Sequence, residues 1–247
     1  FSSNSKISDE NVVDFSFSLL KNNHQFEMPK NIENELLKRL NPIIENTDDP
    51  FFYEESPSLC NFMAKLMAFS LIQQPVCVSG PTGAGKTSAA RKFARMRRCH
   101  SKSKSQFQMH SFHAGTKTSQ FYGTATLANG TIDFVEGTLT TALKNGDVFI
   151  ADEFNLSPQS VMKSLAPALE QTVGSNIYIP GINKEINISS EFFFIACQND
   201  LGTLGRNAIP ETISPRFVYI DYPKPELKDL STICMEIAKE KDENGIT

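Results

Sequence analysis

The sequence predicts an α/β protein whose parallel sheet is flanked by helices, and two observations predict this class. Short apolar segments typical of buried strands, such as residues 75–79 and 191–197, alternate with segments of helical periodicity, such as residues 58–72. A glycine-rich loop also connects the strand at 75–79 directly to a helix at 88–98. Strands that alternate with helices form parallel sheets, because a crossover helix returns the chain to the edge at which each strand begins.

Residues 1–56 are expected to form an N-terminal extension that contains one helix. Residues 31–40 have the spacing of an amphipathic helix, and its apolar face consists of Ile32, Leu36, Leu37 and Leu40. Packing of this face against the main domain is the simplest role for it. The helix at 58–72 follows and leads into the first strand, so we place the start of the main domain at residue 57.

The loop at residues 80–87 reads GPTGAGKT and fits the pattern G-x-x-x-x-G-K-[ST] at every fixed position. Its glycines allow the backbone angles that turn successive N–H groups inward around phosphate oxygens, and the following helix adds the positive end of its dipole. Lys86 would reach the β- and γ-phosphates of a nucleotide, and the Thr87 hydroxyl would complete a Mg²⁺ shell. The residues expected to bind the nucleotide are Gly80, Pro81, Thr82, Gly83, Ala84, Gly85, Lys86, Thr87 and Ser88. A glycine-rich turn with a surface lysine is the alternative, but a strand and a helix flank the loop as phosphate binding requires.

Beyond the helix at 88–98, the chain is expected to add a strand, a β-hairpin and a short helix. Residues 106–112 alternate as a strand does. Asn129-Gly130 is a strong signal for a two-residue hairpin turn and has strand residues on both sides. Residues 137–145 have the pattern of a short helix, and Gly146 follows as its C-cap.

An apolar strand at residues 147–153 ends in two carboxylates, Asp152 and Glu153. Strands of an open parallel sheet direct their C-terminal ends to the crevice in which ligands bind, so this pair is expected beside the glycine loop. Asp152 would hold Mg²⁺, directly or through water, and Glu153 would act as the general base on the attacking water. The alternative is an acidic surface without chemistry.

The remaining elements complete the predicted sheet. A helix is expected to begin with Ser157 at its N-cap and Pro158 at its first position, and Pro167 should distort it or end it early. After this helix the sequence predicts a second hairpin at residues 173–190 and strands at 191–197 and 218–221. A linker and the start of a helical lid follow at 223–247.

Three polar residues in the last quarter of the chain are further candidates for the site. Asn199, at a strand end, would place an amide near the γ-phosphate and the attacking water, unless it merely starts a turn. Arg216 would stabilise transition-state charge in a neighbouring module, as an arginine finger does. Arg206 is the rival for this role, and a simple surface ion pair is the alternative for either arginine.

Four segments together resemble the AAA+ ATPase modules of the midasin, MoxR and McrB-type branch, which is related to dynein, and midasin modules resemble the chain most. The segments are GPTGAGKT at 80–87, VFIADEFNLSP at 148–158, FFFIACQND at 192–200 and SPRF at 214–217. The resemblance extends from Pro57 to Asp221. It implies a P-loop NTPase fold, with three αβα layers around a parallel sheet, β-hairpin insertions, and a C-terminal helical lid that is largely missing from this sequence.

The same resemblance implies roles for single residues: Walker A for Lys86 and Thr87, Walker B for Asp152 and Glu153, the first sensor for Asn199, and the arginine finger for Arg216. The hairpin around Asn129-Gly130 resembles the helix-2 insert of this branch, and residues 173–190 resemble the hairpin before the first sensor. Hairpins of these kinds usually face partners or a central opening. The stretch HAGTKTSQFYG at 113–123 resembles the T-D…L-G segment of the family, but Lys117 departs from it, and we assign it no role.

The resemblance implies an ATP-binding and hydrolysing module of a larger ring-forming protein, with ATP and Mg²⁺ as cofactors. Hydrolysis between neighbouring AAA+ modules would move a protein or ribonucleoprotein partner. Two alternatives remain open: a nucleotide-binding structural module with little hydrolysis, and a GTP-specific motor of the McrB type or another P-loop phosphotransferase. The sequence contains no N/T-K-x-D stretch, which argues against a Ras-like GTPase.

Composition narrows the partners and the compartment. A net charge of −4 argues against a general binder of polyanions. Basic residues gather between positions 91 and 104, where a solvated helix face, a subunit contact and a nucleic-acid patch all stay open. No apolar run reaches membrane-spanning length, and residues 1–10 lack the apolar core of a signal peptide. No membrane partner is therefore expected. Five widely spaced cysteines indicate reduced thiols, and hence a cytoplasmic or nuclear protein.

Overall fold

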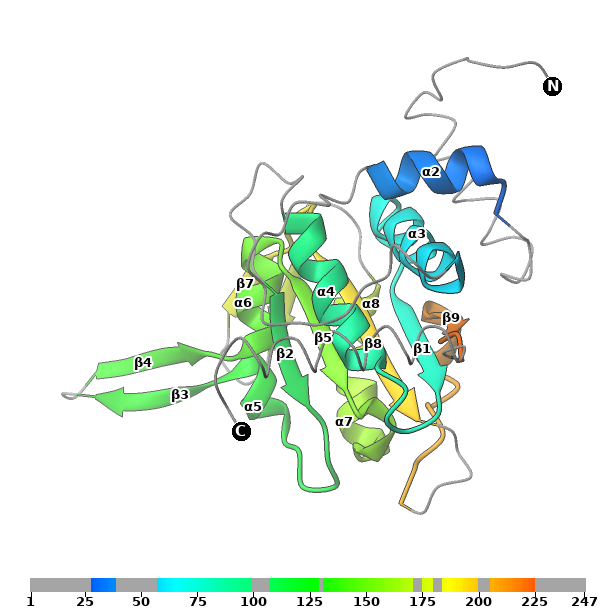
Figure 1. Cartoon of the computed structure of the whole chain (residues 1–247). Coiled ribbons are helices and arrows are strands. Elements are labelled where there is room, and N and C mark those ends of the chain that lie inside the picture. The colour runs from blue at the N-terminus through cyan, green and yellow to red at the C-terminus, as the bar shows by residue number, and fades with distance from the viewer. Residues whose placement is uncertain are drawn as a thin grey trace, which may run out of the picture.

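A five-stranded parallel sheet forms the centre of the protein (Figure 1). The computed structural model describes residues 28–38, 57–98, 107–128, 131–170, 175–179, 184–199 and 205–224. The strands of the sheet are β1 (Val76–Gly80), β2 (Phe107–Ser111), β5 (Val148–Asp152), β8 (Phe193–Asn199) and β9 (Val218–Asp221). They lie in the order β2-β5-β8-β1-β9, and every neighbouring pair is parallel. The predicted α/β class with a parallel sheet is confirmed.

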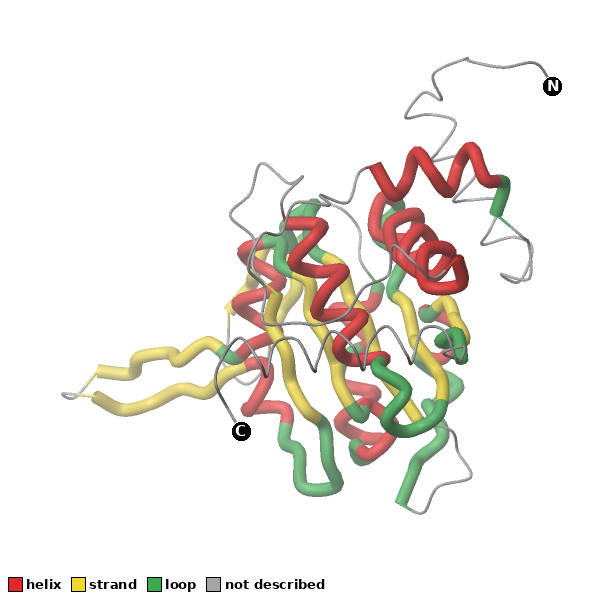
Figure 2. The backbone as a smooth tube through the Cα atoms, in the orientation of Figure 1, coloured by secondary structure: helices red, strands yellow, loops and turns green. Residues whose placement is uncertain are grey.

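Helices cover both faces of this sheet, which makes three layers (Figure 2). They are α3 (Pro57–Leu71), α4 (Lys86–Arg98), α5 (Thr118–Tyr122), α6 (Thr138–Asn145), α7 (Gln159–Ser164) and α8 (Ala166–Leu169). Buried side chains of α3 and α4 pack with Val78 and Ile195 on one face. Those of α5, α6, α7 and α8 pack with Cys77 and Phe194 on the other. The predicted αβα arrangement is confirmed, and it follows from the alternation of side chains along each strand.

The central strands are buried on both faces because their sequences are apolar throughout. In β8, Phe193, Ile195 and Cys197 belong to one core cluster, whereas Phe194 and Ala196 belong to the other. Such two-sided burial is usual for parallel strands that are covered by helices. It explains why this strand is a continuous apolar run in the sequence and does not alternate with polar residues.

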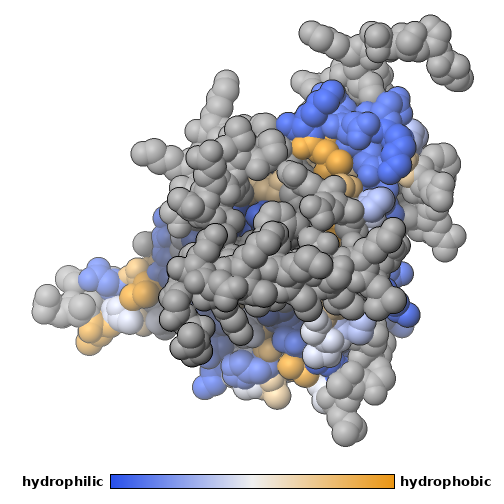
Figure 3. Space-filling view, in the orientation of Figure 1, coloured by the Kyte–Doolittle hydropathy of each residue, from blue (hydrophilic) through white to orange (hydrophobic). Residues whose placement is uncertain are grey.

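Two antiparallel hairpins accompany the central sheet, as predicted. β3 (Gly123–Ala128) pairs with β4 (Thr131–Glu136), and β6 (Asn176–Ile179) pairs with β7 (Lys184–Asn187). The second hairpin packs its isoleucines on the core, whereas the first projects away from the body of the molecule (Figure 1). Leu127 and Val135 are 77% and 55% exposed on the first hairpin, where Figure 3 shows hydrophobic residues. The predicted turn at Asn129-Gly130 lies outside the described residues, as do residues 180–183 of the second predicted hairpin.

The predicted helix of the N-terminal extension is confirmed. α2 (Lys30–Lys38) lies against α3, with Leu36 buried in the shared core. Glu33 is also buried, and its carboxylate forms an ion pair with Lys30 Nζ at 2.9 Å. The rest of the predicted extension and the predicted lid lie in residues 1–27, 39–56 and 225–247, which are outside the described ranges.

Two local predictions differ from the structure. The helix expected from Ser157-Pro158 begins later, at Gln159, because Ser157 instead ends a 3₁₀ turn, η1 (Phe154–Leu156). Pro167 interrupts this helix as predicted, since the chain resumes as α8 after Leu165. The sequence also does not predict α5. At its start, Lys117 N donates a hydrogen bond to Gln120 Oε1 at 3.0 Å. This short helix lacks the apolar periodicity by which a helix is recognised in a sequence.

The cysteines that the structure describes are free thiols, as predicted. Cys60, Cys77 and Cys197 form no disulfide, and Cys99 and Cys234 lie outside the described residues. Burial raises the pKa of the Cys77 and Cys197 thiols, so both stay protonated at neutral pH. Among the described helices, none is long and apolar enough to cross a membrane.

Candidate nucleotide-binding and active site

Three strands bring the candidate residues to one edge of the sheet. β1 ends at Gly80 and β8 ends at Asn199, and these two residues face each other in the parallel register. β5 is the other neighbour of β8 and ends at Asp152. Neighbouring parallel strands end on the same side, so the glycine loop, the acids and Asn199 converge there.

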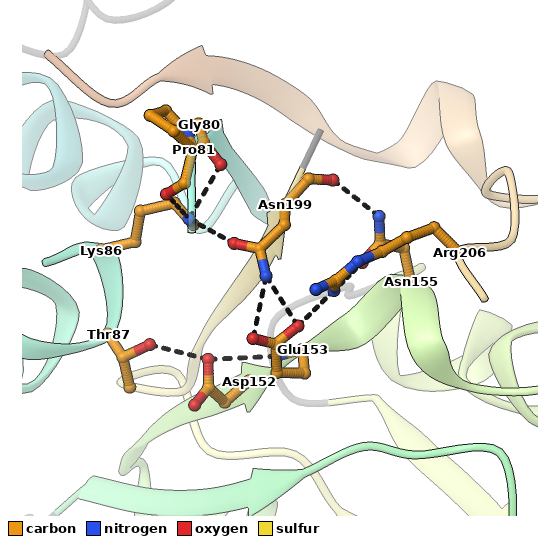
Figure 4. A network of polar contacts seen from close by, with 9 residues as sticks. All are labelled: Gly80, Pro81, Lys86, Thr87, Asp152, Glu153, Asn155, Asn199 and Arg206. Carbon is orange, nitrogen blue, oxygen red and sulfur yellow. Dashed lines mark hydrogen bonds and ion pairs between the residues drawn. The ribbon is translucent and has the colours of Figure 1, made fainter. Parts of the chain in front are cut away.

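Lys86 begins α4 and extends toward the end of β8 (Figure 4). Its ammonium group donates to Gly80 O at 2.9 Å, to Pro81 O at 2.7 Å and to Asn199 Oδ1 at 2.6 Å. Lys86 is only 6% exposed, so its charge depends on protein acceptors in place of water. A phosphate group in the loop would offer this ammonium a fully charged acceptor, which is a stronger partner than a carbonyl.

Thr87 and Asp152 connect the loop to the acidic end of β5. The Thr87 hydroxyl donates to Asp152 Oδ1 at 2.7 Å. Mg²⁺ takes octahedral oxygen ligands at about 2.1 Å, so two adjacent ligands lie roughly 3 Å apart, and it usually takes one or two protein ligands beside phosphates and water. The two oxygens therefore fit Mg²⁺. The described residues contain no group of three or more His, Cys, Asp or Glu side chains that offers a rival metal site.

Glu153 follows Asp152 with a left-handed backbone, φ 53°. This conformation costs a non-glycine residue on the order of 1 kcal/mol and concentrates at functional sites. The carboxylate faces Asn199, whose amide nitrogen donates to both Glu153 oxygens at 2.9 Å. Asn199 therefore joins Lys86 and Glu153, because its Oδ1 accepts from one and its Nδ2 donates to the other.

Arg206 and Asn155 also belong to this network. Arg206 Nη1 forms an ion pair with Glu153 and donates to Asn155 Oδ1 at 3.1 Å. Asn155 is fully buried, and its amide donates to Asn199 O at 2.7 Å. The sequence predicts Arg206 only as a rival arginine finger and assigns Asn155 no role. The contact between Arg206 and Glu153 spans 53 positions of the chain, and no local pattern reveals it.

Arg216 lies apart from this network, at the end of η3 (Ser214–Arg216). Its guanidinium forms an ion pair with Glu170 and donates to Thr212 O. The Arg216 side chain is 28% exposed and the Glu170 side chain is 57% exposed. Exposed ion pairs of this kind are weak, so Arg216 can exchange Glu170 for another partner at small cost.

The shape of the loop depends on glycine backbone angles. Gly85 has φ +95°, which strains any residue with a β-carbon, and a β-carbon there would also lie 3.4 Å from Tyr222 Oη. Tyr222 follows β9 and is held by a hydrogen bond from its backbone N to Ser79 O at 2.7 Å. The other predicted nucleotide contacts surround this turn: Pro81, Thr82 and Gly83 are exposed, and Ala84, Thr87 and Ser88 are half-buried.

Comparison with known proteins identifies the family of this chain. Residues 75–217 match the AAA domain of the dynein-related subfamily. The chain is 24% identical to midasin of Giardia intestinalis over 186 residues, and this match covers 74% of this chain and 4% of that protein. It is 26% identical to midasin of Dictyostelium discoideum over 195 residues, and this match covers 76% of this chain and 3% of that protein. The uncharacterized protein YojN of Bacillus subtilis is 30% identical over 180 residues, with 69% of this chain and 55% of YojN covered.

A solved structure has the same fold. The crystal structure of a candidate ATPase from Cytophaga hutchinsonii matches with a TM-score of 0.56 at 15% identity, and the match covers 93% of this chain and 58% of that chain. This likeness concerns the fold alone. The family match is the stronger finding because it covers more than half of the 247 residues and includes Lys86, Asp152, Glu153 and Asn199. The protein therefore belongs to the dynein-related subfamily of AAA ATPase domains.

Proposed function

We propose that this protein binds ATP with Mg²⁺ in the loop at residues 80–88 and hydrolyses it as one module of a larger ring-forming protein. In that protein, hydrolysis moves a protein or ribonucleoprotein partner. Membership of the AAA family supports ATP binding. The similarity to midasins supports the ring and the movement, which concern a larger protein, because the chain spans only 4% and 3% of the midasins that it matches.

The hydrogen bond from Thr87 Oγ1 to Asp152 Oδ1 carries this proposal. It pairs a hydroxyl at the start of the loop helix with a carboxylate from a different strand, at a spacing that suits two ligands of one Mg²⁺. Mg²⁺ bound there would neutralise phosphate charge and draw the β- and γ-phosphates toward the loop. A glycine turn without a ligand would not need an acid from β5 at this position.

The side chains divide the remaining work in the proposed reaction. Lys86 exchanges a protein acceptor for phosphate oxygens and stabilises the charge that develops on them. Glu153 accepts a proton from the attacking water. Asn199 donates to both oxygens of Glu153, so it keeps this carboxylate beside the loop. A neighbouring module would complete this site with an arginine of its own, and Arg216 of this chain would act in the same way on the next site, as the arginine finger of the proposal.

We also propose that residues 57–222 form the nucleotide-binding core, between an extension at 1–56 and a linker with the start of a lid at 223–247. α3 begins at residue 57, and Tyr222 packs beside the loop just beyond the end of the family match. The free thiols of Cys60, Cys77 and Cys197 support a reducing compartment, the cytoplasm or the nucleus.

Calorimetric titration with ATP, ADP and GTP tests the proposed ligand. We expect ATP and ADP to bind, and we expect EDTA to weaken ATP binding because Thr87 and Asp152 then lose the shared metal. Phosphate release by the full-length parent protein tests hydrolysis. Selective GTP binding would favour a GTP-specific motor, and ATP binding without phosphate release would favour a structural module. A chain that binds no nucleotide would contradict the proposal.

Lys86→Ala should weaken Mg-ATP binding about 30- to 4,000-fold. The change removes a buried ammonium group from phosphate oxygens, and truncating one partner of such a charge pair costs about 2–5 kcal/mol. Titration with a fluorescent ATP analogue measures the loss. Lys144→Ala is the matched control, because Lys144 pairs with Glu136 on the surface and this variant should bind normally. Equal weakening in both variants would remove Lys86 from the proposed site.

A further inference from the structure

Arg206 lies against the carboxylate that we propose as the base for hydrolysis. We propose that Arg206 is a positioning residue, which orients Glu153 for the attacking water from within the same chain. The inference rests on the proposed function. Its first support is the ion pair between Arg206 Nη1 and Glu153 Oε2 (Figure 4).

Burial distinguishes this ion pair from an ordinary surface pair. The Arg206 side chain is 8% exposed and the Glu153 side chain 32%, whereas the values for Arg216 and Glu170 are 28% and 57%. Water and salt screen a buried pair little, and such a pair requires defined geometry, whereas exposed pairs contribute little. The Arg206 pair is part-buried, with the guanidinium almost fully enclosed, so it constrains the Glu153 carboxylate more than a pair between two exposed side chains would.

The contacts of Glu153 are unequal at its two oxygens. Asn199 Nδ2 donates to Oε1 and to Oε2 at 2.9 Å each, and Arg206 Nη1 adds a second donor to Oε2 alone. Each carboxylate oxygen accepts about two hydrogen bonds. Within these contacts Oε2 is filled, and Oε1 keeps one acceptor position. A water that approaches the carboxylate is therefore directed to Oε1.

Asn155 holds Arg206 in place. Arg206 Nη1 donates to Asn155 Oδ1 at 3.1 Å, and Asn155 Nδ2 donates to Asn199 O at 2.7 Å. Asn207 N donates to Asn155 O at 2.7 Å, which attaches the segment that carries Arg206 to η1. These contacts join the end of β8, the turn after β5 and residues 205–207. The contacts of Asn155 with Asn207 and Asn199 do not involve the Arg206 side chain. Loss of that side chain should therefore change the orientation of Glu153 more than the surrounding fold.

Arg206 Nε is buried and has no hydrogen-bond partner among the residues that the structure describes. A buried N–H without a partner costs free energy, and native proteins keep few of them. The guanidinium is thus placed to contact Glu153 and Asn155 although this placement leaves Nε unpaired.

Arg206→Ala and Arg206→Lys test the inference in the full-length parent protein with Mg-ATP. We expect Arg206→Ala to lower kcat about 10- to 100-fold, as small misplacements of a reacting group do, and to change the Kd for ATP less than about threefold. Arg206→Lys keeps the charge and should recover part of the lost kcat. In the Glu153→Gln background, Arg206→Ala should change kcat less than about twofold, because it acts through Glu153.

Arg97→Ala is the matched control. Arg97 pairs with Glu191, its side chain is 12% exposed, and it lies at the opposite end of α4 from the loop. This variant should lower the melting temperature and leave kcat unchanged. If the wild type turns over and Arg206→Ala keeps its kcat, the inference alone is overturned. If Arg206→Ala raises the Kd as much as it lowers kcat/KM, Arg206 binds nucleotide and the inference is also overturned. A wild type without turnover would overturn the proposed hydrolysis together with the inference.

Discussion

Glu153→Gln is expected to leave ATP binding nearly intact and to lower turnover about 10²- to 10⁴-fold, the usual contribution of a positioned general base. Glutamine keeps the size of the side chain and one carbonyl oxygen, but an amide does not take a proton from water. Thr87 and Asp152 keep their hydrogen bond, so the proposed metal ligands are unchanged. Titration measures the binding, and single-turnover phosphate release measures the chemical step apart from product release.

The control for this variant has to account for a small loss of stability. Glu153 accepts from Asn199 and Arg206, whereas a glutamine would turn an NH₂ group toward one of these donors. Thermal melting shows that loss directly. Glu136→Gln removes a charge from the surface pair with Lys144 and should keep full turnover. If Glu153→Gln instead abolishes ATP binding, Glu153 holds the nucleotide and its assignment as base is wrong.

Local patterns explain how much of the fold could be predicted. β1 and α4 flank a loop whose glycines and lysine have fixed spacing, so strand, loop and helix are recognisable together. Gly146 has φ +76° at the end of α6, the left-handed C-cap that glycine favours. β8 is recognisable because an apolar run of this length suits a strand that is buried on both faces.

Contacts between distant segments could not be predicted. The sequence indicates a parallel sheet but not the order β2-β5-β8-β1-β9, because that order depends on which crossovers pass over which strands. It does not indicate the left-handed backbone at Glu153, since neither the residue type nor its neighbours require it. It also does not reveal Asn155, whose role depends on Arg206 and Asn199 meeting at a buried amide.

The two arginines show how the structure separates residues that look alike in sequence. Both lie between β8 and β9, and either is a candidate finger by its position in the chain. Arg206 contacts the acid of its own chain in a part-buried pair, whereas Arg216 lies at the surface with an exposed partner. Arg216 can reach another module by leaving a surface pair, whereas Arg206 would have to leave a part-buried one, so the roles that we propose for them differ.

Arg216→Ala should lower turnover about 10³- to 10⁵-fold in the assembled parent protein and have no effect on the isolated chain. A finger stabilises charge on the transferred phosphate of the neighbouring site, and this contribution is absent when no neighbour is present. ATP affinity at the site of the altered chain should stay unchanged. Among the described residues, the Arg216 side chain contacts Glu170 and Thr212, and neither belongs to the proposed site. Phosphate release from the assembly and from the isolated chain, measured side by side, checks this result.

Glu170→Gln separates a finger from a structural ion pair. Both variants break the pair between Arg216 and Glu170, but only Arg216→Ala removes the guanidinium. If the pair matters for stability alone, the two variants lower the melting temperature equally and turnover per folded molecule is normal in both. If Arg216 acts on the neighbour, Glu170→Gln keeps turnover, since an exposed pair contributes at most about 1 kcal/mol and its loss releases the arginine. Arg216→Lys should stay defective because an ammonium cannot reproduce the planar fork of the guanidinium. A defect of equal size in the isolated chain would contradict action on a neighbour and assign Arg216 to its own site.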